Sequence, residues 1–349
     1  MFITFSSKKN WLFGSILLLI SGLLLIIHQS NQDSYQLQNL KQNQKKNKYI
    51  EVITPDWATG STLTELGLPP LGIGDKEGYR VWVATPKLPQ SVIDVGLRTA
   101  PNPELISLLR PDLIIDNPYY EDNRSIYDAN TPVESITFGF DFENMDNTKP
   151  LKWSRMVDST LKIGRLIERP RRTEHYIESS RQQIEAAGAI VQQHLGTNRK
   201  MVVANLYSVQ QMNSFGINST IRLATDMMGL DLVSLGTSSA FGVASIPLHR
   251  IYDIPADTCL IIMEPISPFV KYQLKNSLLW QHSRFSEPNA CLYVIKPVWH
   301  FGGINVLLQF SNNLAEEVAK PRDYNLVLNT DPKIEESKTD PIHTKAHEL

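Results

Sequence analysis

Residues 151–194 carry no strand signal, and this stretch constrains the fold of the 349-residue chain more than any other feature. Its apolar positions recur at helical spacing, as in Met156, Ile163 and Leu166. Pro170 then stands where proline suits the first turn of a second helix. We therefore expect two helices in the middle of the chain, the second of them long.

On both sides of this stretch, short apolar strands alternate with helices. That alternation is typical of parallel sheets covered by helices. We expect an α/β protein of two Rossmann-like lobes with parallel sheets, joined by a long α-helix. The expected parts are an N-terminal lobe at 49–150, a helical crossing at 151–197 and a C-terminal lobe at 198–320. The strands are expected at 49–53, 71–73, 112–115, 201–205, 259–263 and 292–295, with helices ending near Leu66 and spanning 104–109.

The first thirty residues suggest export. Lys8 and Lys9 precede an unbroken apolar run at 11–27, the arrangement of a signal peptide or N-terminal membrane anchor over residues 1–28. No small-x-small cleavage pattern follows Ile27, which favours an uncleaved anchor, although both alternatives stay open. Residues 29–48 are polar and predict a linker, and residues 321–349 predict a disordered charged tail.

Composition and motifs exclude several classes of function. A formal net charge of −2 argues against a nucleic-acid-binding protein. The sequence has no GxSxG, Walker or HExxH motif, so we do not expect an enzyme. The two cysteines, Cys259 and Cys291, are too few for a thiolate zinc cluster. Each opens an expected strand, and the pattern leaves a disulfide and two buried thiols as open alternatives.

Two blocks of sequence carry a family resemblance. Residues 79–102 read YRVWVATPKLPQSVIDVGLRTAPN, and residues 103–115 continue as PELISLLRPDLII. Looser matches are SFGINS at 214–219 and PVWHFG at 297–302. Over residues 49–320 the chain resembles the periplasmic ferric-hydroxamate-binding proteins of ABC importers, within the siderophore and cobalamin substrate-binding family.

The resemblance implies a class III periplasmic binding protein, whose two α/β lobes are joined by one long helix. It implies capture of a ferric hydroxamate siderophore in the periplasm and delivery to an inner-membrane permease with its ATPase. Iron(III) would be bound only through the siderophore, so we expect no metal ligand and no cofactor of the protein's own. We also expect a monomer, with membrane association through the N-terminal segment.

Two polar residues are the first candidates for ligand binding. A ferric hydroxamate presents oxygens around a saturated metal, so its receptor needs hydrogen-bond donors and flat apolar walls. Arg98, in the VGLRT motif, matches the family arginine that contacts these oxygens, and guanidinium offers several donors. Tyr120 matches the family tyrosine and follows a strand, where open α/β sheets bind ligands. Adjacent Tyr119 is the alternative to Tyr120. A solvated loop arginine or a salt bridge would also explain Arg98, and ordinary loop packing would also explain Tyr120.

Aromatic residues complete the candidate site. Trp82 and Trp299 match family tryptophans lining the cleft; both stand in loop-like motifs beside proline or glycine, although tryptophan is more often core. Phe241 and Phe301 stand where the family pattern has Trp and Tyr, which keeps aromatic area but removes two polar tips. His300 has no partner histidine nearby and is interpreted as a loop residue rather than a ligand.

Family receptors dock on the permease through one acidic residue per lobe. Glu104, Glu121 and Asp122 are candidates in the first lobe, although each is also simply explained as a solvated charge. Pro247 stands at the corresponding position of the second lobe, so the docking contacts stay unassigned.

Three other functions compete with siderophore binding. A haem or cobalamin carrier of the same fold would also use an aromatic cleft. A tethered interaction protein that has lost transport would keep the fold and the N-terminal segment. A direct metal-ion receptor would need several converging His and carboxylate ligands, and the histidines of the expected lobes have no metal-ligand spacing.

Overall fold

The computed structural model describes residues 50–139, 147–287 and 289–320. Contacts divide the chain after Ile50, and the fold below belongs to the unit that begins at Glu51. The apolar run at 11–27, the linker and the tail lie outside the described residues, and their interpretation stays a prediction. In the part of the chain that is described, no helix combines the length and apolar character needed to cross a membrane.

The first sheet is entirely parallel, as the sequence predicts. Its strand order is β3-β2-β1-β4-β5, so β1 lies in the middle, and β2 and β4 flank it. The chain therefore crosses to the opposite side of β1 when it enters β4. The strands are β1 (Val52–Thr54), β2 (Gly72–Ile73), β3 (Ile93–Asp94), β4 (Leu113–Asp116) and β5 (Val133–Ser135).

The helices between these strands begin at polar caps. Asp56 caps α2 by accepting from the backbone N–H of Thr59, and Asn102 caps α4 in the same way, with proline at the first turn. These caps explain why the helices start directly after the loops. The helical elements are α2 (Trp57–Glu65), α3 (Lys76–Trp82), α4 (Pro103–Leu109) and the 3-10 segment η1 (Pro118–Ile126).

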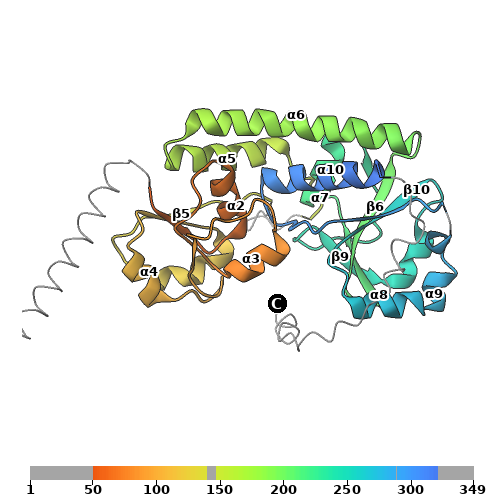
Figure 1. Cartoon of the computed structure of the whole chain (residues 1–349), viewed down its shortest axis with the longest axis horizontal. Helices are drawn as coiled ribbons and strands as arrows, with labels where there is room; N and C mark the ends of the chain where they lie inside the picture. The colour runs from red at the N-terminus through yellow and green to blue at the C-terminus, as the bar shows by residue number, and fades with distance from the viewer. Residues whose placement is uncertain (1–49, 140–146, 288, 321–349) are drawn as a thin grey trace, which may run out of the picture. The chain divides into compact units, whose positions relative to one another are not determined.

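The two helices expected in the middle of the chain are confirmed. They are α5 (Trp153–Leu166) and α6 (Pro170–Leu195). The 26 residues of α6 span about 39 Å. It packs on α5 at one end and on α7 and α10 at the other, and Figure 1 shows it crossing both lobes. Gly188 permits close approach to α7, because a Cβ there would lie 2.6 Å from the Met228 backbone.

The second sheet is mixed, which corrects the expectation of two parallel sheets. Its order is β11-β10-β6-β7-β9; β8 also pairs with β6, while β7 is antiparallel to both its neighbours. The physical reason is the connection at 207–210, which is long enough for a hairpin but too short for a crossover. The strands are β6 (Lys200–Leu206), β7 (Gln211–Phe215), β8 (Asp231–Leu232), β9 (Val243–Pro247), β10 (Thr258–Met263) and β11 (Leu292–Ile295).

Polar side chains shape the start of α7 in the second lobe. Ser219 accepts from the backbone N–H of Arg222 and caps α7, whereas Asn218 bonds Ser238 and the backbone of Ser239. The elements are α7 (Thr220–Met227), η2 (Leu248–Asp253), α8 (Pro268–Lys275), α9 (Leu278–Gln281), η3 (Arg284–Ser286) and α10 (Ile304–Val318).

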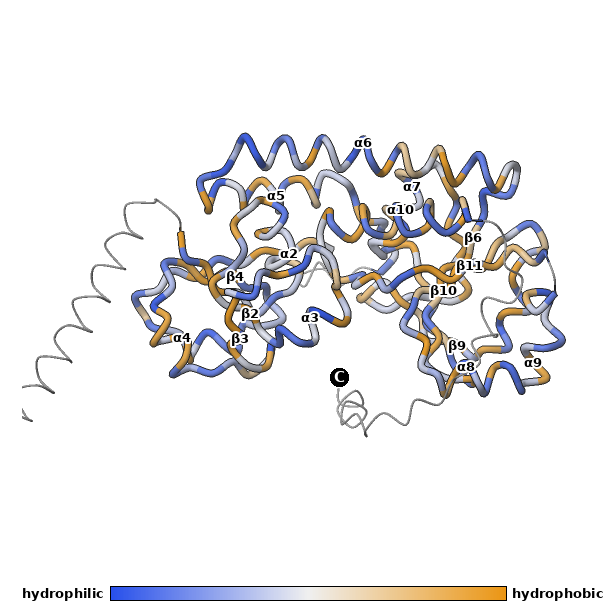
Figure 2. Tube along the Cα trace, in the orientation of Figure 1, coloured by the Kyte–Doolittle hydropathy of each residue, from blue (hydrophilic) through white to orange (hydrophobic). Residues whose placement is uncertain are grey.

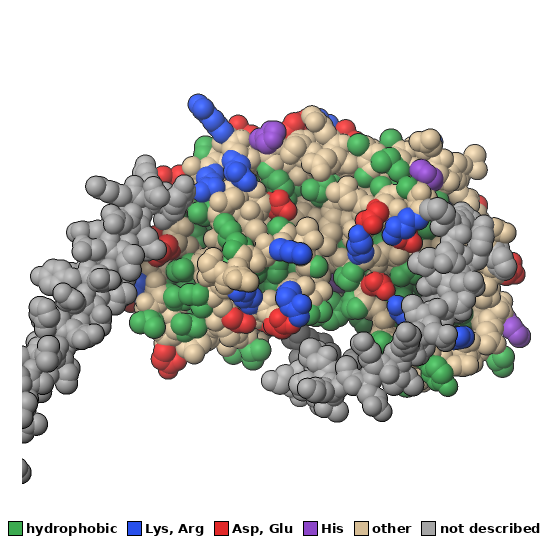
Figure 3. Space-filling view, viewed as in Figure 1, with side chains coloured by type: hydrophobic (Ala, Val, Ile, Leu, Met, Phe, Trp, Pro, Cys, Tyr) green, Lys and Arg blue, Asp and Glu red, His purple; other side chains and the backbone are tan. Residues whose placement is uncertain are grey.

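Apolar strands form the core of each lobe. Figure 2 shows hydrophobic residues concentrated along β6, β10 and β11. Strands β6 and β10 are buried along almost their whole length, whereas buried and half-buried residues alternate along β11. On the face drawn in Figure 3, basic and acidic side chains are interspersed rather than gathered by sign. The lobes therefore have ordinary globular surfaces there, without a basic face.

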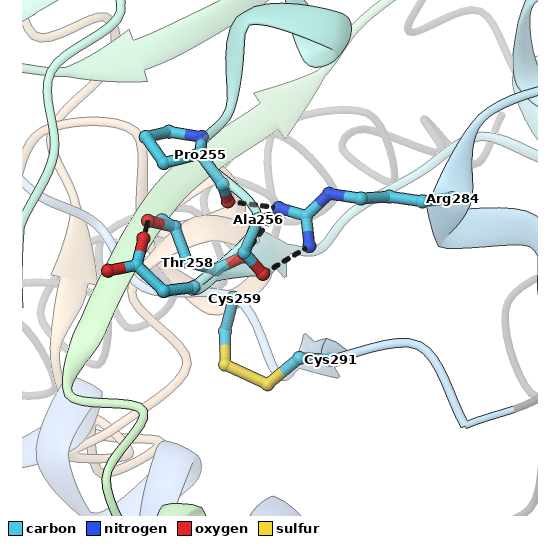
Figure 4. Close-up of a disulfide and its surroundings, with 7 residues drawn as sticks. Pro255, Ala256, Thr258, Cys259, Arg284 and Cys291 are labelled. Carbon is cyan, nitrogen blue, oxygen red and sulfur yellow. Dashed lines mark hydrogen bonds between the residues drawn. A yellow bond between two sulfur atoms is a disulfide. The ribbon is translucent and has the colours of Figure 1, made fainter.

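A disulfide joins Cys259 and Cys291 in the second lobe, which decides between the two open alternatives (Figure 4). The cause is register: β10 and β11 pair in parallel with Leu260 opposite Leu292, so the residues before them are adjacent. The Cα atoms of the two cysteines are 4.7 Å apart. Arg284 donates to the backbone carbonyls of Pro255 and Thr258 beside the bridge.

Helix α10 connects the lobes a second time. Its Gln309 Nε2 donates to the carbonyls of Val83 (3.1 Å) in the first lobe and Pro297 (3.2 Å) in the second. At its start, a Cβ on Gly303 would lie 2.6 Å from the ring of Phe138. Contacts thus hold both lobes in one unit, and the predicted domain boundaries at 150 and 197 stay predictions.

Candidate ligand-binding site

The loop after β3 carries Arg98. Gly96 adopts a φ of 96°, which favours glycine, and its backbone forms an isolated bridge with Pro101. The backbone N–H of Asn102 donates to Val95 and closes the loop at 2.7 Å. Asn123 Nδ2 donates to the Arg98 carbonyl at 3.0 Å. These bonds hold the arginine backbone in place, so its side chain starts from a fixed position.

The Arg98 guanidinium is surrounded by aromatic rings from both lobes. Its Cζ lies 4.2 Å from the ring centroid of Trp57, 5.4 Å from Trp299 and 5.5 Å from Tyr120. One terminal nitrogen donates to the Tyr120 hydroxyl. Its Nε is buried and has no hydrogen-bond partner among the described residues. A buried donor without a partner is rare in proteins, which makes this nitrogen the strongest sign of a ligand site.

Tyr120, rather than Tyr119, meets the arginine. Both follow β4 in η1, but Tyr120 is 2% exposed and Tyr119 is 43% exposed. Their ring centroids are 5.1 Å apart, so the exposed ring packs edge-on against the buried one. Burial raises the pKa of Tyr120, and the positive charge of Arg98 only partly opposes this. The hydroxyl therefore stays protonated at neutral pH and can donate a hydrogen bond.

The polar site residues of the first lobe gather at the carboxyl ends of parallel strands. Trp57 follows β1, Arg98 follows β3, and Tyr120 follows β4. Because β2 and β4 lie on opposite sides of β1, the strand order reverses here. Crevices at such reversal points are where open α/β sheets bind ligands.

Trp299 is the central ring of the aromatic cluster. Its centroid lies 4.9 Å from Trp57, 4.9 Å from Phe301 and 6.3 Å from Trp82. The loop-like setting predicted for Trp82 is wrong, because Trp82 is the last residue of α3 and packs on the buried core around Tyr79. The sequence suggested a loop because the Ala-Thr-Pro segment at 84–86, which begins two residues after Trp82, breaks the helical pattern.

Phe241 and Phe301 extend this cluster along the second lobe. Their ring centroids are 6.3 Å apart, and Phe241 is 40% exposed. Phe241 precedes β9, and Phe301 lies in the loop before α10. The structure thus brings the predicted aromatic residues of the second lobe together.

His300 lies in the same loop, as expected. Its ring is packed between Phe215 and Phe301, with centroids 4.9 Å and 3.8 Å away. Burial lowers the pKa of His300 to about 3, so the imidazole is neutral at pH 7. Its Nε2 is buried and unpaired within the described part of the molecule.

Two residues of the site were missed by the sequence analysis. Trp57 supplies the ring nearest to the guanidinium, and its Nε1 donates to the Gly74 carbonyl at 2.7 Å. Asp56 is buried beside it, and this burial raises the pKa of its carboxyl group, with the charge of Arg98 only partly opposing the rise. Their position directly after β1 was the available signal, because this is where an open sheet binds ligands.

A hollow of about 420 Å³ lies beside the loop that carries Arg98. Arg98 itself does not line it, so the hollow adjoins the loop rather than the aromatic cluster. Its lining residues are Asp75, Asp94, Gly96, Leu97, Asn102 and Leu105. Across residues 50–139, 147–287 and 289–320, no three His, Cys, Asp or Glu side chains are grouped to hold a metal ion.

The residues considered for permease docking all lie at the surface. Glu104, in the first turn of α4, is exposed, as are Glu121 and Asp122 in η1. Glu121 pairs with Arg124 at 3.5 Å. Pro247 ends β9 and is exposed. Their role in docking stays a prediction.

Comparison with known proteins places this geometry in a family. The family model described as "Periplasmic binding protein" matches residues 52–289. The iron(3+)-hydroxamate-binding protein FhuD of Escherichia coli K12 is 27% identical over 205 residues, which are 57% of this chain and 64% of that protein. The alignment therefore spans less than two thirds of that relative.

Two solved structures show the same fold. FhuD from Vibrio cholerae, bound to Fe3+-Desferal, has a TM-score of 0.67 at 21% identity, covering 77% of this chain and 97% of that one. A periplasmic heme binding protein from Pseudomonas aeruginosa has a TM-score of 0.57 at 16% identity, covering 76% and 91%. These matches confirm the fold class and the resemblance found in the sequence.

Proposed function

This chain belongs to the periplasmic binding protein family, and we propose that it is the solute-binding component of an ABC importer. Its cargo in this proposal is a ferric hydroxamate siderophore, captured in the periplasm and delivered to an inner-membrane permease with its ATPase. The function is binding rather than catalysis.

The observation that carries the proposal is the buried Nε of Arg98, which meets no partner among the described residues. A ferric hydroxamate offers oxygen acceptors around an iron that its chelator already saturates. The free donor and the Tyr120 hydroxyl supply hydrogen bonds, and Trp57 and Trp299, whose centroids are 4.9 Å apart, supply flat aromatic walls beside them. Iron(III) enters as cargo, and the site needs no metal ligand of its own.

The mechanism of capture follows from where these groups originate. Arg98 and Tyr120 belong to the first lobe, and Trp299 to the second, so a ligand among them contacts both lobes. The helices α6 and α10 each contact elements on both sides of the site. We infer that the site is largely preformed, which lowers the ordering cost of binding.

For localisation, we propose that the chain is exported and that the apolar segment at 11–27 keeps it at the inner membrane as a monomer. Lys8 and Lys9 before the run, and the missing cleavage pattern after it, support this. N-terminal sequencing of the mature protein tests the anchor: loss of the first 28 or so residues would contradict it.

Fluorescence titration with a panel of ligands tests the function. The six tryptophans include Trp57 and Trp299 at the site, so ligand binding should quench emission. We expect submicromolar binding of ferric tris-hydroxamates and weaker binding of haemin and cobalamin. Tight binding of haemin or cobalamin alone would replace the proposal by a macrocycle carrier, and no binding of any ligand would favour a tethered interaction protein.

Arg98→Ala tests the site itself. Removing the donors should weaken binding by about 1.5–3 kcal/mol, roughly 10- to 150-fold. Arg80→Ala is the matched control, because Arg80 is an exposed arginine of the same lobe that pairs with Glu77 on its own helix. Equal dissociation constants for wild type and a folded Arg98→Ala variant would contradict the assignment.

A further inference from the structure

The SFGINS segment at 214–219 carries part of the family resemblance but has no role in the site described so far. It joins the end of β7 to the start of α7. Ser219 caps the helix, so Asn218 is not needed for capping. Asn218 is nonetheless only 7% exposed, and a buried amide requires hydrogen-bond partners. The location of these partners therefore indicates what the side chain holds in place.

Asn218 bonds a loop that lies 20 to 22 residues further along the chain. Its Oδ1 accepts from the Ser238 hydroxyl at 2.6 Å, and its Nδ2 donates to the backbone carbonyls of Ser239 at 2.9 Å and Ala240 at 3.3 Å. These three residues directly precede Phe241, a ring of the aromatic cluster. An amide that served only its own turn would bond within that turn, so the arrangement indicates an anchor for the loop.

Glycines let this loop rest directly on the segment. A Cβ on Gly216 would lie 2.3 Å from the Ser238 hydroxyl oxygen, and a Cβ on Gly242 would lie 2.8 Å from the Cα of Ser219. The backbone N–H of Gly216 donates to the Gly242 carbonyl at 2.9 Å. A side chain at either glycine would push the loop away. Backbone contact and the Asn218 amide thus act on the same few residues.

Thr220 holds the second aromatic loop of this lobe. It is 4% exposed, and its hydroxyl donates to the backbone carbonyl of His300 at 2.6 Å. That loop also carries Trp299 and Phe301. One short stretch of chain therefore anchors both loops, and the rings of Phe241 and Phe301 meet edge to face with centroids 6.3 Å apart.

We infer that Asn218 is a positioning residue for the ligand site, which fixes the loop at 233–242 so that the Phe241 ring forms part of the wall of the second lobe. Thr220 is its counterpart for the loop of Trp299 and Phe301. This role rests on the proposed function, because it takes these rings as the wall that a ligand meets. Phe241 is 40% exposed, so packing holds its ring only in part, and the loop backbone sets its direction.

Asn218→Ala tests the inference, because it removes the amide and introduces no charge. The dissociation constant for ferrichrome, a ferric tris-hydroxamate, is measured by fluorescence titration. We expect it to rise about three- to tenfold, the scale of a lost aromatic contact. In the protein without ligand, the loop loses three hydrogen bonds, so mass spectrometry should show faster hydrogen exchange in peptides covering residues 233–242.

Asn205→Ala is the matched control. Asn205 is also a buried asparagine of the second lobe, and its Nδ2 donates to the Met263 carbonyl at 3.1 Å, on a neighbouring strand rather than on the loop. Neither the affinity for ferrichrome nor the exchange at residues 233–242 should change in this variant. A loss of affinity as large as that of Asn218→Ala would show general destabilisation and overturn the inference.

A second background tests whether Asn218 acts through Phe241. In Phe241→Ala, the further change Asn218→Ala should raise the dissociation constant less than about twofold, because the positioned ring is gone. The full effect in this background would overturn the role of Asn218.

Thr220→Val serves if Asn218→Ala does not fold, since it keeps the side-chain volume and removes the hydroxyl. It should weaken ferrichrome binding about three- to tenfold and speed hydrogen exchange at residues 297–303. An unchanged affinity would overturn positioning of the wall by the start of α7.

The outcomes also separate this inference from the proposed function. If the wild type binds ferrichrome and Asn218→Ala binds it equally well, only the positioning role is overturned. If the wild type binds no ferric siderophore, the proposed function is overturned. The exchange measurement on the protein without ligand then still decides whether Asn218 holds the loop.

Discussion

His300 makes the stability of the fold depend on pH in a predictable direction. Its imidazole is packed between Phe215 and Phe301, and burial lowers its pKa from 6.5 to about 3. Below pH 6.5 the unfolded chain therefore gains a proton that the folded protein does not accept. The stability associated with a neutral His300 is complete above pH 6.5 and is lost progressively as the pH falls toward 3.

The size of the effect follows from the two pKa values. A pH of 5 is about 1.5 units below the pKa of this histidine in the unfolded chain, which corresponds to about 2 kcal/mol of lost unfolding free energy. The folded state takes up almost no proton at that pH. His300→Phe removes the titrating group and keeps a ring of similar size in an aromatic environment, so its stability should not carry this loss.

Denaturant unfolding at pH 7 and pH 5 measures the difference. We expect the wild type to lose about 2 kcal/mol more than His300→Phe between these values. His249→Phe replaces an exposed histidine of η2 and serves as the control, because its pH-dependent loss should equal that of the wild type. Equal losses in the wild type and in His300→Phe would refute the reasoning.

Three further measurements test the site and the fold. Trp57→Ala should weaken ferrichrome binding at least about tenfold by removing the ring on which Arg98 stacks; an unchanged dissociation constant by titration would exclude that ring from the site. Replacing both Cys259 and Cys291 by serine should lower the unfolding free energy by about 3–4 kcal/mol for the 32-residue separation, and alkylation of both cysteines without reductant, seen by mass spectrometry, would contradict the bridge. Because α6 and α10 both connect the lobes, small-angle scattering should show little change in radius of gyration on ligand binding. A decrease of several ångströms would instead show large closure of the lobes. In that case, Gln309→Ala should make the decrease larger.

Local features of the fold could be predicted because their causes lie within a few residues. Pro170 opens α6, and the apolar run of β10 forms a buried strand, as the sequence indicated. The position of Arg98 came from its motif, and the structure places it on a loop at the end of β3. Each of these outcomes depends on backbone propensity and near neighbours.

Pairings between distant segments could not be read in this way. Whether Cys259 meets Cys291 depends on the register of two strands separated by a helical connection, and a shift of one residue would part them. Strand β7 was not among the expected strands, so its antiparallel pairing was missed as well. Tertiary packing decided both.

The site shows the same division. The sequence, through its family resemblance, identified a guanidinium, a phenol and several aromatic rings, which are the donors and walls that a siderophore receptor needs. Only the strand order β3-β2-β1-β4-β5 set Trp57 and Tyr120 beside Arg98. Stacking and hydrogen bonding act through space, here between Arg98 and residues 41 and 22 positions away in the sequence, so the chemistry of the site was decided when the sheet assembled.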